Sequence, residues 1–228
     1  MKKNNKKSAK NIIKKEFTAN ELTNFSGIST IFNFMARLGI LKRLNDIDLR
    51  MHHNITYKTG ELLALMILGI QSGMNRLSKI ETFSLDPLVQ SLFGFDGKVS
   101  DSTMAGRFVR ADMHSSTTYM NIIGEFSRKI HGRLKTKRDI IDMDSSVRTV
   151  YGNQQGAGKG FNDKKKGAKS YHPLMAFLNS TRECLLSWLR PGNTYTANGA
   201  EEFFSQLMGM IPASIKSLLL RYDSAFFS

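Results

Sequence analysis

Three aspartates stand where carboxylates could hold a metal ion: Asp142, Asp144 and Asp223. Asp142 and Asp144 alternate within a β-rich segment, so both side chains point to one face of the expected strand. Asp223 follows the last apolar strand, and the strand ends of an α/β sheet are where ligands and metals meet. Carboxylates from neighbouring strands bind hard cations such as Mg²⁺, and two such ions about 4 Å apart serve phosphodiester chemistry. The alternative for any single aspartate at a strand end is that it only caps the next element.

The segments around these aspartates have the period of strands. Residues 139–150, 172–179 and 184–189 are β-rich, and the tight connection before the last of them predicts a hairpin. A helix is expected over residues 198–210, and residues 216–222 form a final strand whose three leucines are typical of a sheet centre. We therefore predict an α/β fold with a three-strand antiparallel meander, then a helix and a parallel strand. The helix supplies the crossover that a parallel pair requires.

This order of strands bears directly on the aspartates. If the first and last strands lie side by side and run parallel, Asp144 and Asp223 approach each other at one end of the sheet. Two like charges so close repel each other unless a cation, a basic side chain or a proton intervenes. The sequence therefore predicts a site for Mg²⁺ or Mn²⁺ between Asp144 and Asp223.

The chain before the strands has the 3.6-residue period of helices instead. Apolar residues recur at helical spacing over residues 28–38, with Gly39 as the expected C-cap, and residues 115–131 form a longer helix. Residues 59–71 are apolar on nearly every side, which predicts a helix at the centre of a core. Three parts are therefore expected: a disordered basic tail over residues 1–17, a helical DNA-binding region over 18–137 and the α/β part over 138–228.

Two short helices within the helical region resemble a helix-turn-helix. Asp86 and Pro87 suit the start of the first, Ser100 suits the start of the second, and residues 94–99 link them. Such a pair can read DNA through its second helix, although short helix pairs are common in any helical domain. Three basic residues near the pair are the expected DNA contacts: Lys98, Arg107 and Arg110.

The chain is strongly basic, with 33 Lys and Arg against 19 Asp and Glu and a net charge of +14. The excess gathers in three blocks, Met1–Lys15, Arg128–Arg138 and Lys159–Lys169, and each block alone would also fit a solvated tail or loop. Together they suit the neutralisation of nucleic-acid phosphates. Four lysines of the third block are the expected contacts there: Lys164, Lys165, Lys166 and Lys169.

Composition excludes several classes of protein. With 41% apolar residues the chain can bury a core, which excludes wholesale disorder. The single cysteine, Cys184, excludes a disulfide scaffold and a cysteine-rich zinc module. No apolar run reaches the roughly 18–20 residues of a membrane span, and no secretory signal is evident. We therefore expect no membrane partner and a cytoplasmic protein, associated with the nucleoid if it is bacterial.

The α/β part also contains a series of short motifs in a fixed order. They are Asp142-Met-Asp144-Ser-Ser, Val150-Tyr-Gly152, Gly160-Phe-Asn162, Lys165-Lys-Gly167, Ser170-Tyr-His-Pro-Leu174, Leu189-Arg-Pro-Gly-Asn193, Thr196-Ala-Asn-Gly199 and Arg221-Tyr-Asp-Ser-Ala-Phe226. Together these motifs resemble the insertion-sequence DDE transposases of the DDE group 1 type. The resemblance is close over about residues 139–228 and is only one of style over residues 25–132. It implies an RNase H-like fold, of which this chain has a partial catalytic core, and metal-dependent DNA strand cleavage and transfer in transposition.

The same resemblance implies roles for the aspartates. Asp144, directly before Ser145, takes the first catalytic role and Asp223 the second, both as ligands of Mg²⁺ or Mn²⁺, while Asp142 accompanies them. The resemblance also implies double-stranded DNA of the transposon ends as the partner. It leaves open a homo-oligomer of the full-length protein.

The third acid of the family, a glutamate, comes on a helix well after the second aspartate. Glu183, Glu201 and Glu202 all lie before Asp223, and five residues follow it. The sequence therefore predicts a transposase truncated before its third catalytic acid and inactive as it stands, so whether this chain is itself an enzyme stays open. The alternative is a catalytically inert DNA-binding remnant that occupies transposon ends without cutting. A basic RNA-binding protein, a third interpretation, has no recognition-module signature to support it.

Overall fold

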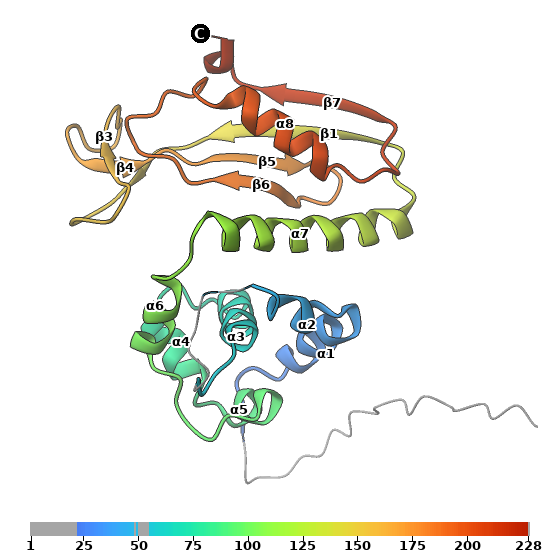
Figure 1. Ribbon diagram of the computed structural model, residues 1–228, viewed down its shortest axis with the longest axis vertical. Helices are drawn as coiled ribbons and strands as arrows, with labels where there is room; N and C mark the ends of the chain where they lie inside the picture. The colour runs from blue at the N-terminus through green and yellow to red at the C-terminus, as the bar shows by residue number, and fades with distance from the viewer. Residues whose placement is uncertain (1–21, 48, 50–54, 228) are drawn as a thin grey trace, which may run out of the picture.

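The structure is a computed structural model that describes residues 22–47, 49 and 55–227. The basic block Met1–Lys15 and the tail expected over residues 1–17 lie outside the described residues. The described chain forms a group of helices at one end and a β-sheet with its own helix at the other, and the long helix α7 runs between them (Figure 1).

The N-terminal part of the described chain is helical. Its elements are α1 (Ile28–Leu38), α2 (Ile40–Leu44), α3 (Thr59–Gln71), α4 (Leu77–Phe83), α5 (Pro87–Phe93), α6 (Asp101–Phe108) and α7 (Met113–Leu134). The helices predicted over residues 28–38 and 59–71 are confirmed, and Gly39 ends α1 in the left-handed conformation with φ 78°. The helix predicted over residues 115–131 is confirmed as α7, which extends further at both ends.

Helix α3 is the centre of the helical core, as its nearly uniform apolarity predicts. Leu62, Leu65 and Leu68 have no exposed surface, and α7 adds Ile122 and Phe126 to the same cluster. Because each fully buried leucine contributes roughly 1.5–3 kcal/mol, this packing stabilises the helical core, which α7 joins through its contact with α2. The beginning of the α/β part is therefore held by the helical core.

The short pair α5–α6 forms where the helix-turn-helix was expected, and the predicted residues cap it. The carboxylate of Asp86 accepts a hydrogen bond from Leu88 N at 2.9 Å, and Ser100 Oγ accepts one from Thr103 N at 3.1 Å. The link between the two helices is held down by Phe95, whose side chain is buried in the helical core. Both helices are therefore short, well-capped elements of that core.

The main sheet has the predicted topology. Its strands are β1 (Arg138–Ser145), β5 (Leu174–Leu178), β6 (Cys184–Trp188) and β7 (Ser217–Tyr222). They lie in the order β6-β5-β1-β7, with β5 antiparallel to β1 and β6, and β7 parallel to β1. Helix α8 (Ala200–Met210) makes the crossover to β7 and packs on one face of the sheet through Phe203 and Leu207 (Figure 1). The meander, the helix and the parallel strand are thus confirmed.

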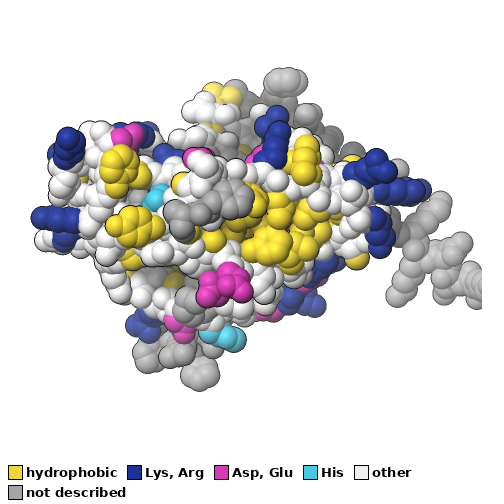
Figure 2. Space-filling view, turned by 90° about the horizontal axis from the view of Figure 1, so that it is seen from above, with side chains coloured by type: hydrophobic (Ala, Val, Ile, Leu, Met, Phe, Trp, Pro, Cys, Tyr) yellow, Lys and Arg dark blue, Asp and Glu magenta, His cyan; other side chains and the backbone are white. Residues whose placement is uncertain are grey.

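Strand β7 lies at the edge of the described sheet, so the prediction of a central strand was wrong for the described residues. Leu218 and Leu220 pack against the core under α8, whereas Leu219 is 57% exposed on the other face. A run of leucines does not distinguish a strand covered on both faces from an edge strand. A groove of about 280 Å³, lined in part by Phe204 and Tyr222, follows this edge on the α8 side. Figure 2 looks onto the edge and shows hydrophobic side chains gathered near its middle, with Lys and Arg side chains around the margins.

A second, small sheet interrupts the meander. Its strands are β2 (Arg148–Thr149), β3 (Gly158–Lys159) and β4 (Lys169–Tyr171), in the order β2-β4-β3. The strands predicted over residues 139–150 and 172–179 are therefore too long, each at the end that meets the small sheet. Pro173 explains the break, because proline has no N–H to donate to a ladder, and its carbonyl instead accepts from Ser146 N at 3.2 Å. We call residues 146–171 the lysine lobe.

Helix α7 is held to the sheet through a buried histidine. His131 has no exposed surface, and its Nε2 lies 3.2 Å from Glu183 Oε2 beside β6. Met120 on the same helix packs against the sheet core, so α7 contributes to both cores. Neither α7, with its 22 residues, nor any other described helix is long and apolar enough to cross a bilayer.

Candidate functional site

Asp144 and Asp223 lie at the C-terminal ends of β1 and β7, at the same end of the main sheet. The two strands pair in parallel register, and the last registered pair is Met143 opposite Tyr222. Asp144 comes one residue later on β1, and Asp223 directly follows the end of β7, so the two aspartates stand at neighbouring strand ends whose spacing is about 5 Å. Both strands run to the end of the sheet that adjoins the lysine lobe (Figure 1).

Both carboxylates belong to the face of the sheet that α8 leaves open. Their immediate neighbours, Met143 and Tyr222, line the groove on the α8 side, so alternation along the strands directs Asp144 and Asp223 to the opposite side. Both aspartates are exposed. Each accepts one hydrogen bond from the residue that follows it, from a backbone N–H at 2.8 Å and from a serine hydroxyl at 3.0 Å.

Asp142 shares this face but is already paired. Arg221, opposite it on β7, donates from Nε at 2.6 Å and from Nη2 at 2.9 Å to the two carboxylate oxygens. This bidentate hydrogen bonding lowers the pKa of Asp142 and raises the pKa of Arg221. Among the described residues, no ion pair neutralises Asp144 or Asp223 in the same way.

The donor set at this edge suits a hard divalent cation. Mg²⁺ takes oxygen ligands and, in phosphate chemistry, is typically bound by one or two carboxylates, with water and substrate phosphates as its other ligands. Asp144 and Asp223 match that number and are accessible to solvent. Within the described part of the chain, no group of three or more His, Cys, Asp and Glu side chains could hold a metal ion. The described residues therefore place two carboxylates at this end of the sheet.

Next to Asp144, a network of hydrogen bonds fixes the end of β1. His172 Nε2 lies 3.0 Å from Ser145 Oγ, and His172 Nδ1 lies 2.6 Å from the Thr194 carbonyl oxygen. Ser145 Oγ is also 3.2 Å from Thr196 Oγ1. The residue after Asp144 is thus held both by the link between β4 and β5 and by the loop that precedes α8.

Arg190 holds the same loop from its inner side. The side chain is buried, and its Nη1 donates to the carbonyl oxygens of Thr196 and Asn198 at 3.2 and 2.8 Å, while its Nε donates to that of His172 at 3.1 Å. Burial lowers the pKa of Arg190. Backbone carbonyls therefore stabilise the buried guanidinium, and the guanidinium in turn fixes the loop that contacts Ser145.

The lysine lobe stands beside this edge of the sheet (Figure 1). Lys164, Lys165 and Lys166 are exposed on it, one after another. Lys169 is half-buried, and its Nζ donates to Asn153 Oδ1 at 3.1 Å. The structure therefore brings the four lysines predicted as DNA contacts to one lobe, with three of them open to solvent.

Two glycines allow the lobe to pack closely against the loop after β6. A Cβ on Gly160 would run into the carbonyl of Gly192, and a Cβ on Gly158 would meet Asn193 Oδ1 at 2.5 Å. The backbones can approach this closely only because the Cβ atoms are absent. The lobe is thereby anchored to the segment that leads into Thr194.

The contacts predicted around α5 and α6 are not brought to this edge. Lys98 Nζ pairs with Glu81 Oε1 at 2.7 Å, which lowers the pKa of Glu81 and raises the pKa of Lys98. Arg107 is only 5% exposed and donates to the Tyr57 carbonyl at 2.9 Å, and its pKa is lowered by burial and by the charge of Arg110. Arg110 lies exposed just beyond α6. Lys98 and Arg107 thus have partners inside the helical part.

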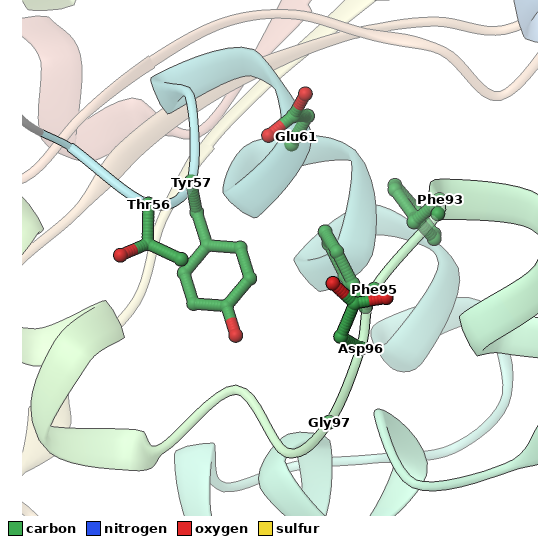
Figure 3. Close-up of a pocket in the computed structure, with 8 residues that line it drawn as sticks. Thr56, Tyr57, Glu61, Phe93, Phe95, Asp96 and Gly97 are labelled. Atoms are coloured by element: carbon green, nitrogen blue, oxygen red, sulfur yellow. The ribbon is translucent and has the colours of Figure 1, made fainter.

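A hollow of about 350 Å³ adjoins the link between α5 and α6 (Figure 3). Three aromatic rings stand around it, with the Phe95 ring centre 5.0 Å from those of Tyr57 and Phe93. The charged side chains of its described lining are Glu61 and Asp96, with no Lys or Arg among them. This hollow has the wrong sign of charge for a phosphate, and DNA reading by the helix pair stays a prediction.

A family model described as transposase DDE domain group 1 matches residues 5–228. The chain belongs to this family of DDE transposases. The match includes the helical part, so the family relationship extends well beyond the motifs of residues 139–228. Among solved structures, the chain is similar to Mos1 transposase in its paired-end complex with the left transposon end, at 12% identity and a TM-score of 0.23. That similarity covers 85% of this chain and 58% of that one. No curated protein matches the chain.

Sequence reasoning did not find the network that positions Asp144 in this DDE transposase chain. Its members come from three of the motifs quoted above: His172 from the link between β4 and β5, Arg190 from just beyond β6 and Thr196 from the loop before α8. The motifs could have pointed to this network, because each contains a polar residue next to a proline or glycine. Their joint role depends on contacts between segments that are distant in sequence.

The Asp142–Arg221 pair predicts an effect of pH on this transposase chain. Because Arg221 lowers the pKa of Asp142 in the folded chain, the pair stabilises the fold above the ordinary aspartate pKa of about 4. That contribution is lost as the pH falls through the lowered value. In Arg221→Gln the pKa of Asp142 should rise toward its ordinary range, and stability should fall less steeply in acid. An NMR titration of Asp142 and urea unfolding at several pH values measure the two effects, and an unchanged titration would contradict the pairing.

Proposed function

We propose that this chain acts in DNA transposition, binding DNA at the lysine lobe and presenting Asp144 and Asp223 to the phosphodiester that is cut and transferred. The observation that carries the proposal is the parallel register of β1 and β7, which aligns the two carboxylates on the open face of the sheet. Membership of the DDE transposase family supports the class of reaction.

The lysine lobe and the two carboxylates carry opposite charges and so have different roles toward DNA. Two carboxylates alone would repel a DNA phosphate, and the exposed lysines beside them offset that repulsion. The backbone that carries these lysines is fixed, because Asn162 Oδ1 accepts from Lys164 N and Lys165 N at 3.1 and 3.0 Å. Each lysine that neutralises a phosphate releases condensed counterions, so binding should weaken steeply as salt rises.

Asp144 and Asp223 are the residues that would hold Mg²⁺ or Mn²⁺. A bound cation of this kind supplies charge stabilisation at the phosphate and lowers the pKa of an attacking water. The chain itself fixes the spacing of the two carboxylates through the β1–β7 ladder and fixes Ser145 through His172. Both carboxylate oxygens of Asp142 accept hydrogen bonds from Arg221, so we do not count Asp142 among the ligands of the cation.

The inert DNA-binding remnant is the second candidate, and the count of acidic ligands favours it. No group of three or more potential ligands occurs among the described residues, so Asp144 and Asp223 are not joined by a third acid there. Two carboxylates leave a cation held mostly by water, and the in-line geometry of phosphoryl transfer then stays unfixed. In this second candidate, the 228 residues by themselves would bind DNA without cutting it.

Salt dependence tests the DNA-binding part. Replacing two lobe lysines, Lys164→Gln with Lys166→Gln, should reduce the slope of log affinity against log salt by about 0.9 for each phosphate that is no longer neutralised. The matched control, Lys42→Gln with Lys79→Gln, removes the same charge from exposed positions of the helical part and should leave the slope unchanged. Fluorescence anisotropy with duplex DNA measures all three proteins. Equal slopes in the two double variants, or an affinity of the unaltered chain that ignores salt, would refute the assignment.

Metal binding tests the carboxylate part. In calorimetric titration with Mn²⁺, the unaltered chain should bind weakly, and Asp144→Asn and Asp223→Asn should each abolish the measurable heat of binding, because each removes one of the two acidic ligands. The control Asp96→Asn removes an exposed carboxylate far from the site and should bind as the unaltered chain does. Mn²⁺ binding that survives both substitutions at the site would show that the cation is held elsewhere.

A further inference from the structure

A hollow of about 410 Å³ opens just beyond the C-terminal end of β1. Its lining residues are Ser146, Val147, Arg148, Phe161, Asp163 and Lys164. Ser146 comes two residues after Asp144, so the rim of the hollow begins about 7 Å along the chain from that carboxylate. The volume falls within the roughly 300–1,000 Å³ of small-ligand sites. The hollow is therefore large enough for a ligand and adjoins the proposed site of DNA chemistry.

An aromatic ring stands in solvent at this hollow. Phe161 is 82% exposed, while the next residue, Asn162, is buried. Asn162 Nδ2 donates to Thr149 Oγ1 on β2 at 2.8 Å, and Asn162 Oδ1 accepts from Lys164 N at 3.1 Å. A single exposed apolar side chain needs no explanation, but here the backbone beside the ring is fixed by a buried anchor. The ring is thus held at the hollow and is not packed into a core.

Cations accompany the exposed rings of the lobe. Arg148 and Lys164 line the same hollow as Phe161. Lys165 Nζ lies 4.9 Å from the centre of the Tyr151 ring, which is 73% exposed. Exposed rings alternating with cations bind single-stranded nucleic acid, because bases stack on the rings while phosphates meet the cations.

An exposed ring of this kind suits unpaired DNA better than paired DNA. A duplex offers its phosphates to the lysines, but its base faces are stacked inside the helix, so Phe161 would have no base to contact. An unpaired nucleotide offers both a base face and a phosphate. The combination of Phe161 with Arg148 and Lys164 therefore fits an unpaired nucleotide better than a base pair.

We propose that this hollow receives an unpaired nucleotide of the DNA strand held at Asp144, with the base stacked on Phe161 and its phosphates beside Arg148 and Lys164. The proposal rests on the proposed function, since it assumes DNA at Asp144. Because the rim of the hollow begins about 7 Å along the chain from Asp144, this nucleotide lies close along the strand to the phosphate at the carboxylate. Asp163, on the same lining, offers an acceptor to an amino group of the base.

Three forms of one duplex test the proposal by fluorescence anisotropy with the 228-residue chain. The first has blunt ends, the second a short unpaired overhang at each end, and the third the same overhangs without bases. The unaltered chain should bind the second form about 5- to 150-fold more tightly than the first, because base stacking on a ring contributes that much. The third form should bind more weakly than the second by the same factor, because it keeps the extra phosphates but has no base to stack.

Variants of the ring complete the test. Phe161→Ala should lose the preference for the overhang, whereas Phe161→Trp should keep it. The matched control Phe34→Ala removes an exposed phenylalanine of α1 and should also keep the preference. A preference that survives Phe161→Ala, or its absence in the unaltered chain, overturns this inference while blunt-duplex binding still supports the proposed function. Failure to bind any of the three DNAs would instead overturn the proposed function.

Discussion

The parallel pairing of β1 with β7 is the constraint on which the α/β part depends. A parallel neighbour needs a crossover, and α8 supplies it while covering one face of the sheet with Phe203 and Leu207. Residues on the other face alternate with the core residues, so Asp144 and Asp223 reach solvent side by side. A shift of one residue in β7 would turn Asp223 toward α8 and end this alignment. The register between β1 and β7 thus determines both which side chains are buried and which carboxylates lie side by side.

The segment between β6 and α8 connects this edge with the lysine lobe. Gly192 lies against Gly160 of the lobe, and Thr196 contacts Ser145 next to the carboxylate. Arg190 fixes the segment from inside through backbone carbonyls. The cationic lobe and the acidic strand ends are therefore held in fixed positions relative to each other. They carry opposite charges and come from different parts of the chain. Under the proposed function, a phosphate approaching the carboxylates meets this fixed arrangement of charges.

The periodicity of the sequence was sufficient to predict an element that buries either one face or all of its faces. Examples are the helices over residues 28–38 and 59–71 and the order of the main strands. It failed where contacts between distant segments decide the structure. The missing N–H of Pro173 divides a strand, and Arg107, which looks like a DNA contact in the sequence, is buried against Tyr57. The motifs indicated the acidic residues of the candidate site, but only the pairing of the strands shows that Arg221 forms an ion pair with Asp142.

Cross-linking of the two catalytic candidates tests the central claim most directly. In a Cys184→Ser background, the double substitution Asp144→Cys with Asp223→Cys puts two thiols on adjacent strands, within the Cα separation of about 4.4–6.8 Å that a disulfide needs. On mild oxidation the account predicts a disulfide within the monomer, seen as faster migration on a non-reducing gel. Asp144→Cys with Leu219→Cys, four residues back along β7, should stay reduced under the same conditions. A reduced 144–223 pair, or equal cross-linking of both pairs, would contradict the register and with it the site.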